Sequence, residues 1–241
     1  MLDLEKREGC CMVERKEYLQ KLWSWKDEQV IKVVTGIRRC GKSTLLKQYQ
    51  NKLKSVGVTE EQIISINFEE LENEPLLDYK SLYQYIKERL CEDKMTYIFL
   101  DEIQKVTSFE KVVDSLHVKE NIDIYITGSN AFLLSSDLAT LFTGRTMEIK
   151  VYPFSFKEYL TYYKITDGYD DAFDQYVKTG GMPGAYVYKT ENRQYDYVRD
   201  VYSTIIIRDL VEKYKIRNKL EFTNISEFMM DNIGNLLSPN N

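Results

Sequence analysis

The sequence predicts an α/β fold: a three-layer αβα domain with a five-stranded parallel sheet, followed by a small all-helical module. Two observations predict it. In the first 152 residues, five short β-rich runs alternate with longer amphipathic runs. Beyond that point the pattern becomes helical, and 12 of the 19 tyrosines are found from Tyr152 onward. Strands that alternate with helices form βαβ units, whose right-handed crossovers place helices on both faces of a parallel sheet.

The elements of the sheet domain are expected in strict alternation. The β-rich runs are residues 31–35, 63–68, 97–100, 122–127 and 146–151. The amphipathic runs between them are residues 43–55, 81–91, 109–118 and 131–142. Each of the first four strands is therefore followed by a helix long enough to cross back over the sheet.

The remainder of the chain is expected to be helical. Residues 154–164, 170–178 and 191–213 have helical patterns, interrupted by a tight turn from Gly180 to Gly184. Residues 221–233 form one more expected helix, and Ser238-Pro239 after it has the form of a helix start. We therefore divide the chain into four parts and expect it to be C-terminally truncated. The parts are an N-terminal helical segment (1–30), an α/β domain (31–152), a helical lid (153–217) and the start of a further domain (218–241).

Composition and charge exclude several classes of protein. Hydrophobic residues make up 43% of the 241 residues and the net charge is −5, which argues against a disordered chain or a dedicated nucleic-acid coat. No apolar stretch approaches the roughly 18 residues that a membrane span needs, and the charged N-terminus lacks a signal sequence. The four cysteines and the single histidine have no zinc-site spacing. We expect a cytoplasmic protein without membrane or zinc.

Residues 36–43 match the phosphate-binding pattern G-x-x-x-x-G-K-[ST] without a mismatch. Its glycines let backbone N–H groups face phosphate oxygens, Lys42 can reach the β- and γ-phosphates, and the Ser43 hydroxyl can bind Mg²⁺. The helix that begins at Ser43 directs its positive end at the same anion. For Arg38 and Arg39, solvated loop charges are the alternative to phosphate or partner contacts. The residues expected to contact the nucleotide are Gly36, Ile37, Arg38, Arg39, Cys40, Gly41, Lys42, Ser43 and Thr44.

An acidic pair ends the third expected strand. Asp101 follows four apolar residues and emerges at the carboxyl end of the strand, where α/β sheets bind ligands. It suits the Mg²⁺ shell beside Ser43. Glu102 can accept a proton from the water that attacks the γ-phosphate. The alternative is a strand that ends in ordinary solvated acids.

Three further positions are candidates for catalytic roles. Ser129 or Asn130 would reach the γ-phosphate or the attacking water if the fourth strand lies between the first and the third. Asn67 would lie beside Glu102 if their strands pair, and could hold that carboxylate away from water until a ligand releases it. Arg145 could project toward a neighbouring subunit's nucleotide. The alternatives are polar residues that merely end strands, and an arginine that complements a helix dipole.

These motifs, in this order, resemble those of the AAA+ ATPases. More narrowly, the segments GIRRCGKST (36–44), LDEIQ (100–104), TGS (127–129), GR (144–145) and GGMP (180–183) are similar to a prokaryotic group of uncharacterised AAA+ proteins. In that group the P-loop ATPase module is followed by a winged-helix-like domain of unknown function, of which this chain would hold at most the start.

The resemblance implies a sheet order of 5-1-4-3-2 and particular roles. Lys42 would bind phosphate, Ser43 and Asp101 would hold Mg²⁺, and Glu102 would act as the base. Ser129 or Asn130 would be the sensor and Arg145 a candidate arginine finger. The lid arginine that many AAA+ proteins use is unassigned, with Arg193, Arg199 and Arg208 as candidates.

Three functions remain open at this point. The first is a Mg²⁺-dependent ATPase that couples turnover to movement of the helical module and to an unidentified protein client, with assembly into a homo-oligomer through Arg145. The second is a nucleotide-gated switch with little turnover, although the presence of both Asp101 and Glu102 favours turnover. The third is a DNA-associated module, for which the net charge of +3 over residues 208–219 is weak support.

Overall fold

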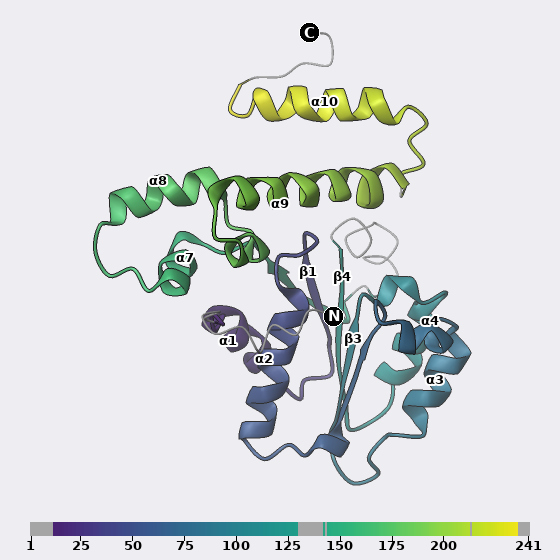
Figure 1. The fold of residues 1–241 in the computed structure, drawn as a ribbon. Helices are drawn as coiled ribbons and strands as arrows, with labels where there is room; N and C mark the ends of the chain where they lie inside the picture. Colours follow the sequence, from purple (N-terminus) through teal and green to yellow (C-terminus); the bar gives the residue numbers. More distant parts are fainter. Residues whose placement is uncertain (1–11, 130–141, 143, 213, 236–241) are drawn as a thin grey trace.

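The computed structural model describes residues 12–129, 142, 144–212 and 214–235, and its centre is a five-stranded sheet (Figure 1). The strand order is β2-β3-β4-β1-β5 and every pair is parallel, so the expected order 5-1-4-3-2 is confirmed. The strands are β1 (Ile31–Gly36), β2 (Ile63–Asn67), β3 (Thr96–Asp101), β4 (Ile122–Ser129) and β5 (Thr146–Val151). Because β1 lies between β4 and β5, the loop after it opens at the sheet's carboxyl edge, one strand in from the edge strand β5.

Helices cover both faces of the sheet. α1 (Lys16–Ser24) and α2 (Lys42–Ser55) pack on the face that carries Tyr97, Phe99 and Tyr125. α3 (Tyr79–Lys87) and α4 (Phe109–His117) pack on the other face, against side chains such as Ile98 and Leu100. Successive residues of β3 therefore point to opposite cores, as the period of a strand requires. This produces the predicted three layers.

Local capping explains where one helix departs from its predicted range. α3 begins at Tyr79 and not at residue 81, because the Asp78 side chain accepts hydrogen bonds from the backbone N–H groups of Lys80 and Ser81. It ends at Lys87, four residues before the predicted end. The helix predicted over residues 131–142 lies outside the described residues, except for Phe142, which is buried.

The helical module contains α7 (Phe156–Tyr163), α8 (Tyr169–Thr179), the short helix η5 (Pro183–Val187), and α9 (Glu191–Thr204). The helix predicted over residues 191–213 is α-helical only to Thr204 and continues as the π-helical segment η6 (Ile205–Glu212). α10 (Lys219–Asp231) follows. In Figure 1, α9 lies across the end of the sheet and α10 lies beyond it.

Aromatic side chains hold this module together and join it to the sheet domain. Phe154, Tyr159 and Tyr186 are buried in one apolar cluster that also contains Val13 from the N-terminal segment. The glycine turn is close to α9, since a Cβ on Gly184 would lie 2.1 Å from the Tyr197 hydroxyl. Tyr159 and Tyr186 therefore serve packing, whereas others such as Tyr169 and Tyr195 are exposed. No helix in the described part of the chain is long and apolar enough to cross a bilayer.

Candidate nucleotide-binding site

The loop between β1 and α2 has the backbone that its glycines permit. Gly36 (φ 156°) and Gly41 (φ 101°) both have positive φ. A Cβ on Gly36 would lie 2.4 Å from the Val151 carbonyl oxygen and 2.7 Å from Cys40 Sγ, so no side chain fits there. The Cys40 thiol is buried in the core, and burial raises its pKa, so this residue offers only its backbone to a ligand.

Lys42 lies at the start of α2 with only 4% of its surface exposed. Its Nζ donates to the carbonyl oxygens of Gly36 (3.2 Å) and Ile37 (3.3 Å). It also lies 3.6 Å from Glu102 Oε1. The ammonium is therefore at the mouth of the loop, within reach of a bound phosphate, and is electrostatically paired with the end of β3.

The acidic pair and Ser43 converge beneath the loop. The Thr127 hydroxyl donates to Asp101 Oδ1 and accepts from the Glu102 backbone N–H (2.9 Å). Burial raises the pKa of Asp101, whereas hydrogen bonds from Ser43 and Thr127 lower it. A carboxylate and a hydroxyl side by side are hard oxygen ligands, which suit Mg²⁺ held jointly with phosphate oxygens and waters. The donor chemistry of Ser43 and Asp101 therefore fits that ion.

Glu102 is turned toward the loop by an unusual backbone conformation. Its φ is 58°, in the left-handed region that residues other than glycine seldom adopt. Gln104 Nε2 donates to Glu102 Oε2 at 2.6 Å, while Gln104 Oε1 is buried without a hydrogen-bond partner. The carboxylate is thus held between Lys42 and Gln104. Gln104 is part of the LDEIQ segment, but sequence reasoning gave it no role.

Asn67 does not make the predicted contact with Glu102. It pairs with Asp101 in the β2–β3 register, but its Oδ1 accepts from the Glu69 N–H (3.0 Å) and its Nδ2 donates to Glu70 (3.4 Å). The side chain is used by the turn that follows β2, because an asparagine at a strand end can bond the backbone two residues later. Among the described residues, Gln104 holds the carboxylate that Asn67 was expected to hold.

The remaining predicted residues lie in different places. Ser129 pairs with Gly36 at the end of β4, next to the loop, and Asn130 lies outside the described residues. Arg145 precedes β5 at the amino end of the sheet, where its carbonyl accepts from the Ile31 N–H. Its guanidinium is about half exposed and lies 3.3 Å from Asp114. Arg145 is therefore at the opposite end of the sheet from its own subunit's loop.

Two loop arginines face the helical module. Arg38 lies 3.0 Å from Glu69 Oε1 and 3.7 Å from Asp209 Oδ1 of η6. Arg39 lies over the Tyr197 ring, 5.7 Å from its centroid. Arg38 is therefore paired with protein carboxylates, whereas Arg39 is exposed to solvent and contacts one aromatic ring. Of the lid candidates, Arg193 and Arg199 are exposed, and the side chain of Arg208 is outside the described residues.

Arg15 is a buried arginine of the site that sequence reasoning missed. Its guanidinium forms a bidentate pair with Glu158 of α7 (2.7 and 3.1 Å) and donates to the carbonyls of Tyr152 (2.9 Å) and Cys40 (3.3 Å). It thereby ties the N-terminal segment, the loop and the helical module together. Its sequence neighbourhood carries no motif, so only the folded arrangement reveals it.

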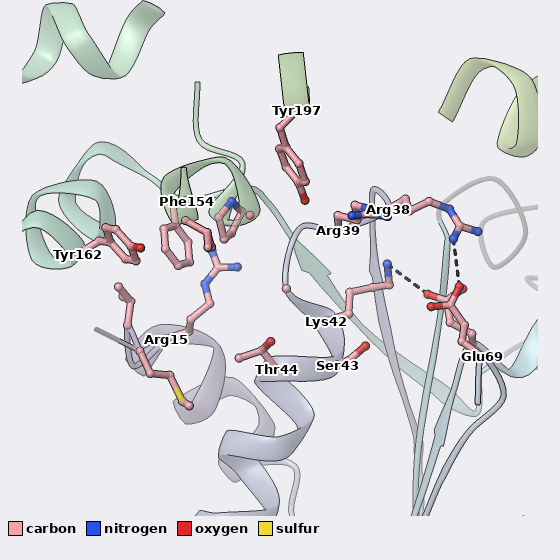
Figure 2. Close-up of a pocket in the computed structure, with 17 residues that line it drawn as sticks. Arg15, Arg38, Arg39, Lys42, Ser43, Thr44, Glu69, Phe154, Tyr162 and Tyr197 are labelled. Atoms are coloured by element: carbon pink, nitrogen blue, oxygen red, sulfur yellow. Dashed lines mark hydrogen bonds and ion pairs between the residues drawn. The ribbon is translucent and has the colours of Figure 1, made fainter. Parts of the chain in front are cut away.

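These groups surround a cavity of about 560 Å³ between the loop and the helical module (Figure 2). Lys42 and Arg38 point to the side of Glu69, while Phe154 and Tyr162 lie at the other side. The end near Glu69 is thus charged, and the other end is mainly aromatic and apolar around the guanidinium of Arg15, which is paired with Glu158. The lining residues are Met12, Val13, Arg15, Arg38, Arg39, Gly41, Lys42, Ser43, Thr44, Glu69, Glu102, Phe154, Tyr162, Pro183, Gly184, Val187 and Tyr197.

A phosphate-binding loop between β1 and α2, with an acidic pair at the end of β3, defines the class of P-loop nucleotide-binding proteins. A family model described as an AAA domain matches residues 28–160, and one described as a domain of unknown function matches residues 170–241. The chain therefore belongs to the AAA family of P-loop ATPases, with a second domain of unknown function.

The similar proteins agree with this assignment. An uncharacterised protein of Haemophilus influenzae is 38% identical over 95% of this chain, and one of Methanocaldococcus jannaschii is 30% identical over 86%. The chain spans 58% and 48% of their lengths. The solved Walker-type ATPase of Pyrococcus abyssi shares the fold, with a TM-score of 0.55 and 19% identity over 86% of this chain and 77% of that one.

Proposed function

We propose that the protein is a Mg²⁺-dependent ATPase that binds ATP between the loop and the helical module and hydrolyses its γ-phosphate. One observation carries the proposal: Lys42 and Ser43 at the start of α2 lie together with Asp101 and Glu102 at the end of β3, beside the cavity. Lys42 lies 3.6 Å from Glu102, and Ser43 hydrogen bonds to Asp101. A loop that bound nothing would gain no stability from burying these charges together.

In this proposal each end of the cavity binds one part of ATP. The backbone N–H groups of residues 36–44 and the Lys42 ammonium bind the phosphates. The base packs against Phe154, Pro183 and Val187 at the apolar end. Ser43 and Asp101 hold Mg²⁺, which when bound neutralises phosphate charge and orients the oxygens for in-line attack.

Glu102 is the proposed general base. Its carboxylate is held by Gln104 at 2.6 Å, so it can accept a proton from a water placed at the γ-phosphate without first being reoriented. Lys42 remains close enough to stabilise the charge that develops on the transferred phosphoryl group. Ser129 or Asn130 would contact the γ-phosphate from the end of β4.

Movement of the helical module is the proposed output. Arg15 and Glu158 join that module to the loop, and the cavity is lined by both parts of the chain. A nucleotide that fills the cavity would therefore contact both at once. The client of this movement is a protein of unidentified nature, and we place the activity in the cytoplasm.

The test is phosphate release by the wild-type protein and by Glu102→Gln. We expect turnover to fall by about 100-fold or more in the variant, with the dissociation constant for an ATP analogue within about twofold of the wild type. Glu72→Gln, which changes an exposed glutamate of η3 (Leu71–Leu76), is the matched control and should retain turnover. Equal rates for wild type and Glu102→Gln, with nucleotide bound by both, would favour a nucleotide-gated switch over an ATPase.

The position of Arg145 is the basis for proposing that the protein forms a homo-oligomer. Because Arg145 is exposed at the far end of the sheet, it can act on a nucleotide only in a neighbouring subunit. Mass photometry with and without ATP measures the assembly. Mixing Arg145→Ala with Lys42→Met should restore part of the turnover that each loses alone, since one supplies an intact loop and the other an intact arginine. A monomer with full turnover would contradict this part.

A further inference from the structure

The loop arginine Arg38 contacts η6 of the helical module as well as the α/β domain to which the loop belongs. Its Nε lies 3.7 Å from Asp209 Oδ1, and its Nη1 lies 3.0 Å from Glu69 Oε1. Asp209 belongs to η6, which continues α9 and leads into α10. The guanidinium therefore connects the phosphate-binding loop, the turn after β2 and the far end of the helical module.

This connection is only partly hydrogen bonded. The Arg38–Glu69 contact satisfies Nη1, but 3.7 Å is too long for a hydrogen bond, and Arg38 Nε is buried without a hydrogen-bond partner. A buried guanidinium donor that lacks an acceptor is costly to keep, and an anion at the charged end of the cavity would satisfy it. Arg38 lines that cavity.

Asp209 lies in the same electrostatic environment as the catalytic groups. It is buried, with 5% of its surface exposed, and its carboxylate is sensitive to the charges of Glu102 and Lys42 as well as Arg38. Without the Arg38 charge, Asp209 would be a buried anion close to Glu102 and to any bound phosphate. A like-charge arrangement of this kind is unfavourable in a poorly solvated site.

We propose that Arg38 and Asp209 form a γ-phosphate-sensitive latch: in the nucleotide-free protein Arg38 holds η6 through Asp209, and a bound triphosphate takes Arg38 over and releases η6. The inference rests on the proposed function, because it requires a nucleotide in the cavity. Asp209 is thus a positioning residue for Arg38 rather than a catalytic residue.

The chemistry of the exchange favours a triphosphate over a diphosphate. A γ-phosphate offers a guanidinium a charged, bidentate acceptor, whereas Asp209 offers charge at 3.7 Å only. Release would concern residues 205–212, after the point where α9 becomes π-helical, and would expose the buried side chains of Ile206 and Val211. The part of α9 around Val201 need not move. Residues 205–212 and α10 would then respond to the presence of the γ-phosphate.

Hydrogen exchange with mass spectrometry tests the latch, using Mg²⁺ with either ADP or a nonhydrolysable ATP analogue. In the wild-type protein we expect faster exchange in residues 205–212 with the analogue than with ADP. In Asp209→Asn, exchange there should be fast without nucleotide and unresponsive to the analogue. The preference for the analogue over ADP, measured by titration, should rise about 5-fold, because Arg38 no longer has to leave a carboxylate.

Two further variants provide a second test of the latch and a control. Arg38→Gln should lose both the preference for the analogue and the exchange response, which provides a second reading if Asp209→Asn folds poorly. Asp200→Asn, on the exposed side of α9, should behave as the wild type. Analogue binding that leaves residues 205–212 unchanged in the wild type, or an Asp209→Asn response equal to the wild type's, would overturn the latch alone. A wild-type protein that binds neither nucleotide would overturn the proposed function as well.

Discussion

The two ends of the parallel sheet each hold a buried lysine beside carboxylates, and their surroundings differ. At the amino end, Lys32 Nζ lies 2.5 Å from Asp123 Oδ1 and donates to the Glu28 carbonyl (2.7 Å). Asp123 Oδ2 accepts from the Asp27 N–H (2.9 Å) and the Tyr125 hydroxyl (2.8 Å). At the carboxyl end, Lys42 has longer contacts, 3.2 to 3.6 Å, with two carbonyls and Glu102.

The difference separates a charge pair that the protein itself completes from one that we propose to be functional. Within the described part of the chain, the buried side-chain nitrogen and oxygen atoms that lack a hydrogen-bond partner are Arg38 Nε and Gln104 Oε1. Both belong to the carboxyl end. At the amino end the partners of Lys32 and Asp123 come from the protein itself, and both side chains are fully buried. Buried polar groups that their own protein leaves unsatisfied are expected where a ligand completes the site.

Replacing the amino-end lysine should have the largest effect, and that effect should be on stability. Lys32→Met leaves the Asp123 carboxylate buried without its cation, which we expect to cost about 3–5 kcal/mol of unfolding free energy. Urea unfolding measures it. Lys32→Met combined with Asp123→Leu should recover part of the loss, because no buried charge remains. If Lys32→Met is as stable as the wild type, the Lys32–Asp123 pair does not stabilise the fold.

Replacing the carboxyl-end lysine should affect binding and not stability. Lys42→Met removes the charge that reaches the phosphates, and we expect the affinity for an ATP analogue to fall by about 2–4 kcal/mol. The unfolding free energy should change by less than about 1 kcal/mol, because its contacts are long and lie at the cavity. Titration with a fluorescent nucleotide and urea unfolding measure the two quantities. A large loss of stability would show that the two lysines are equivalent.

The sequence predicted those features of the carboxyl end that are formed by consecutive residues. The loop from Gly36 to Ser43 is one uninterrupted pattern, and the apolar run before Asp101 is long enough to identify a buried strand. The contacts of Thr127, Gln104 and Asp209 could not be predicted, because each depends on side-chain direction or on a partner far along the chain. Asn67 illustrates the limit: the strand pairing was predicted correctly, yet its amide is used by its own turn.

Replacing Gln104, at the carboxyl end, should have a smaller effect that is confined to kcat. Gln104→Ala removes the hydrogen bond that orients Glu102, so kcat should fall by about tenfold, or 1.4 kcal/mol of barrier, with the affinity for nucleotide unchanged. Gln84→Ala is a matched control, since Gln84 donates to Glu88 (2.7 Å) on an exposed surface of α3. Steady-state kinetics and titration separate the two effects. A change in affinity without a change in kcat would contradict a positioning role.

The smallest effect concerns pH and compares Asp209 with Asp123. Burial raises the pKa of Asp209, and the nearby Arg38 charge opposes this. The folded state therefore binds that proton more tightly than the unfolded chain does. The contribution of Asp209 to the unfolding free energy is highest below its ordinary pKa of 3.8 and declines as the pH rises through the folded-state pKa.

Asparagine does not titrate, so the stability of Asp209→Asn relative to the wild type should rise by about 1 kcal/mol or less between pH 4 and pH 7, from a value that the loss of the Arg38 contact has lowered. Burial raises the pKa of Asp123 as well, but Asp123→Asn should lose more stability at pH 7 than Asp209→Asn does, because Lys32 then loses its anion in a fully buried site. Urea unfolding at both pH values measures the four differences. A larger loss for Asp123→Asn than for Asp209→Asn at pH 7 is expected if the protein itself supplies every partner at the amino end only, and equal losses would mean that the two ends are built alike.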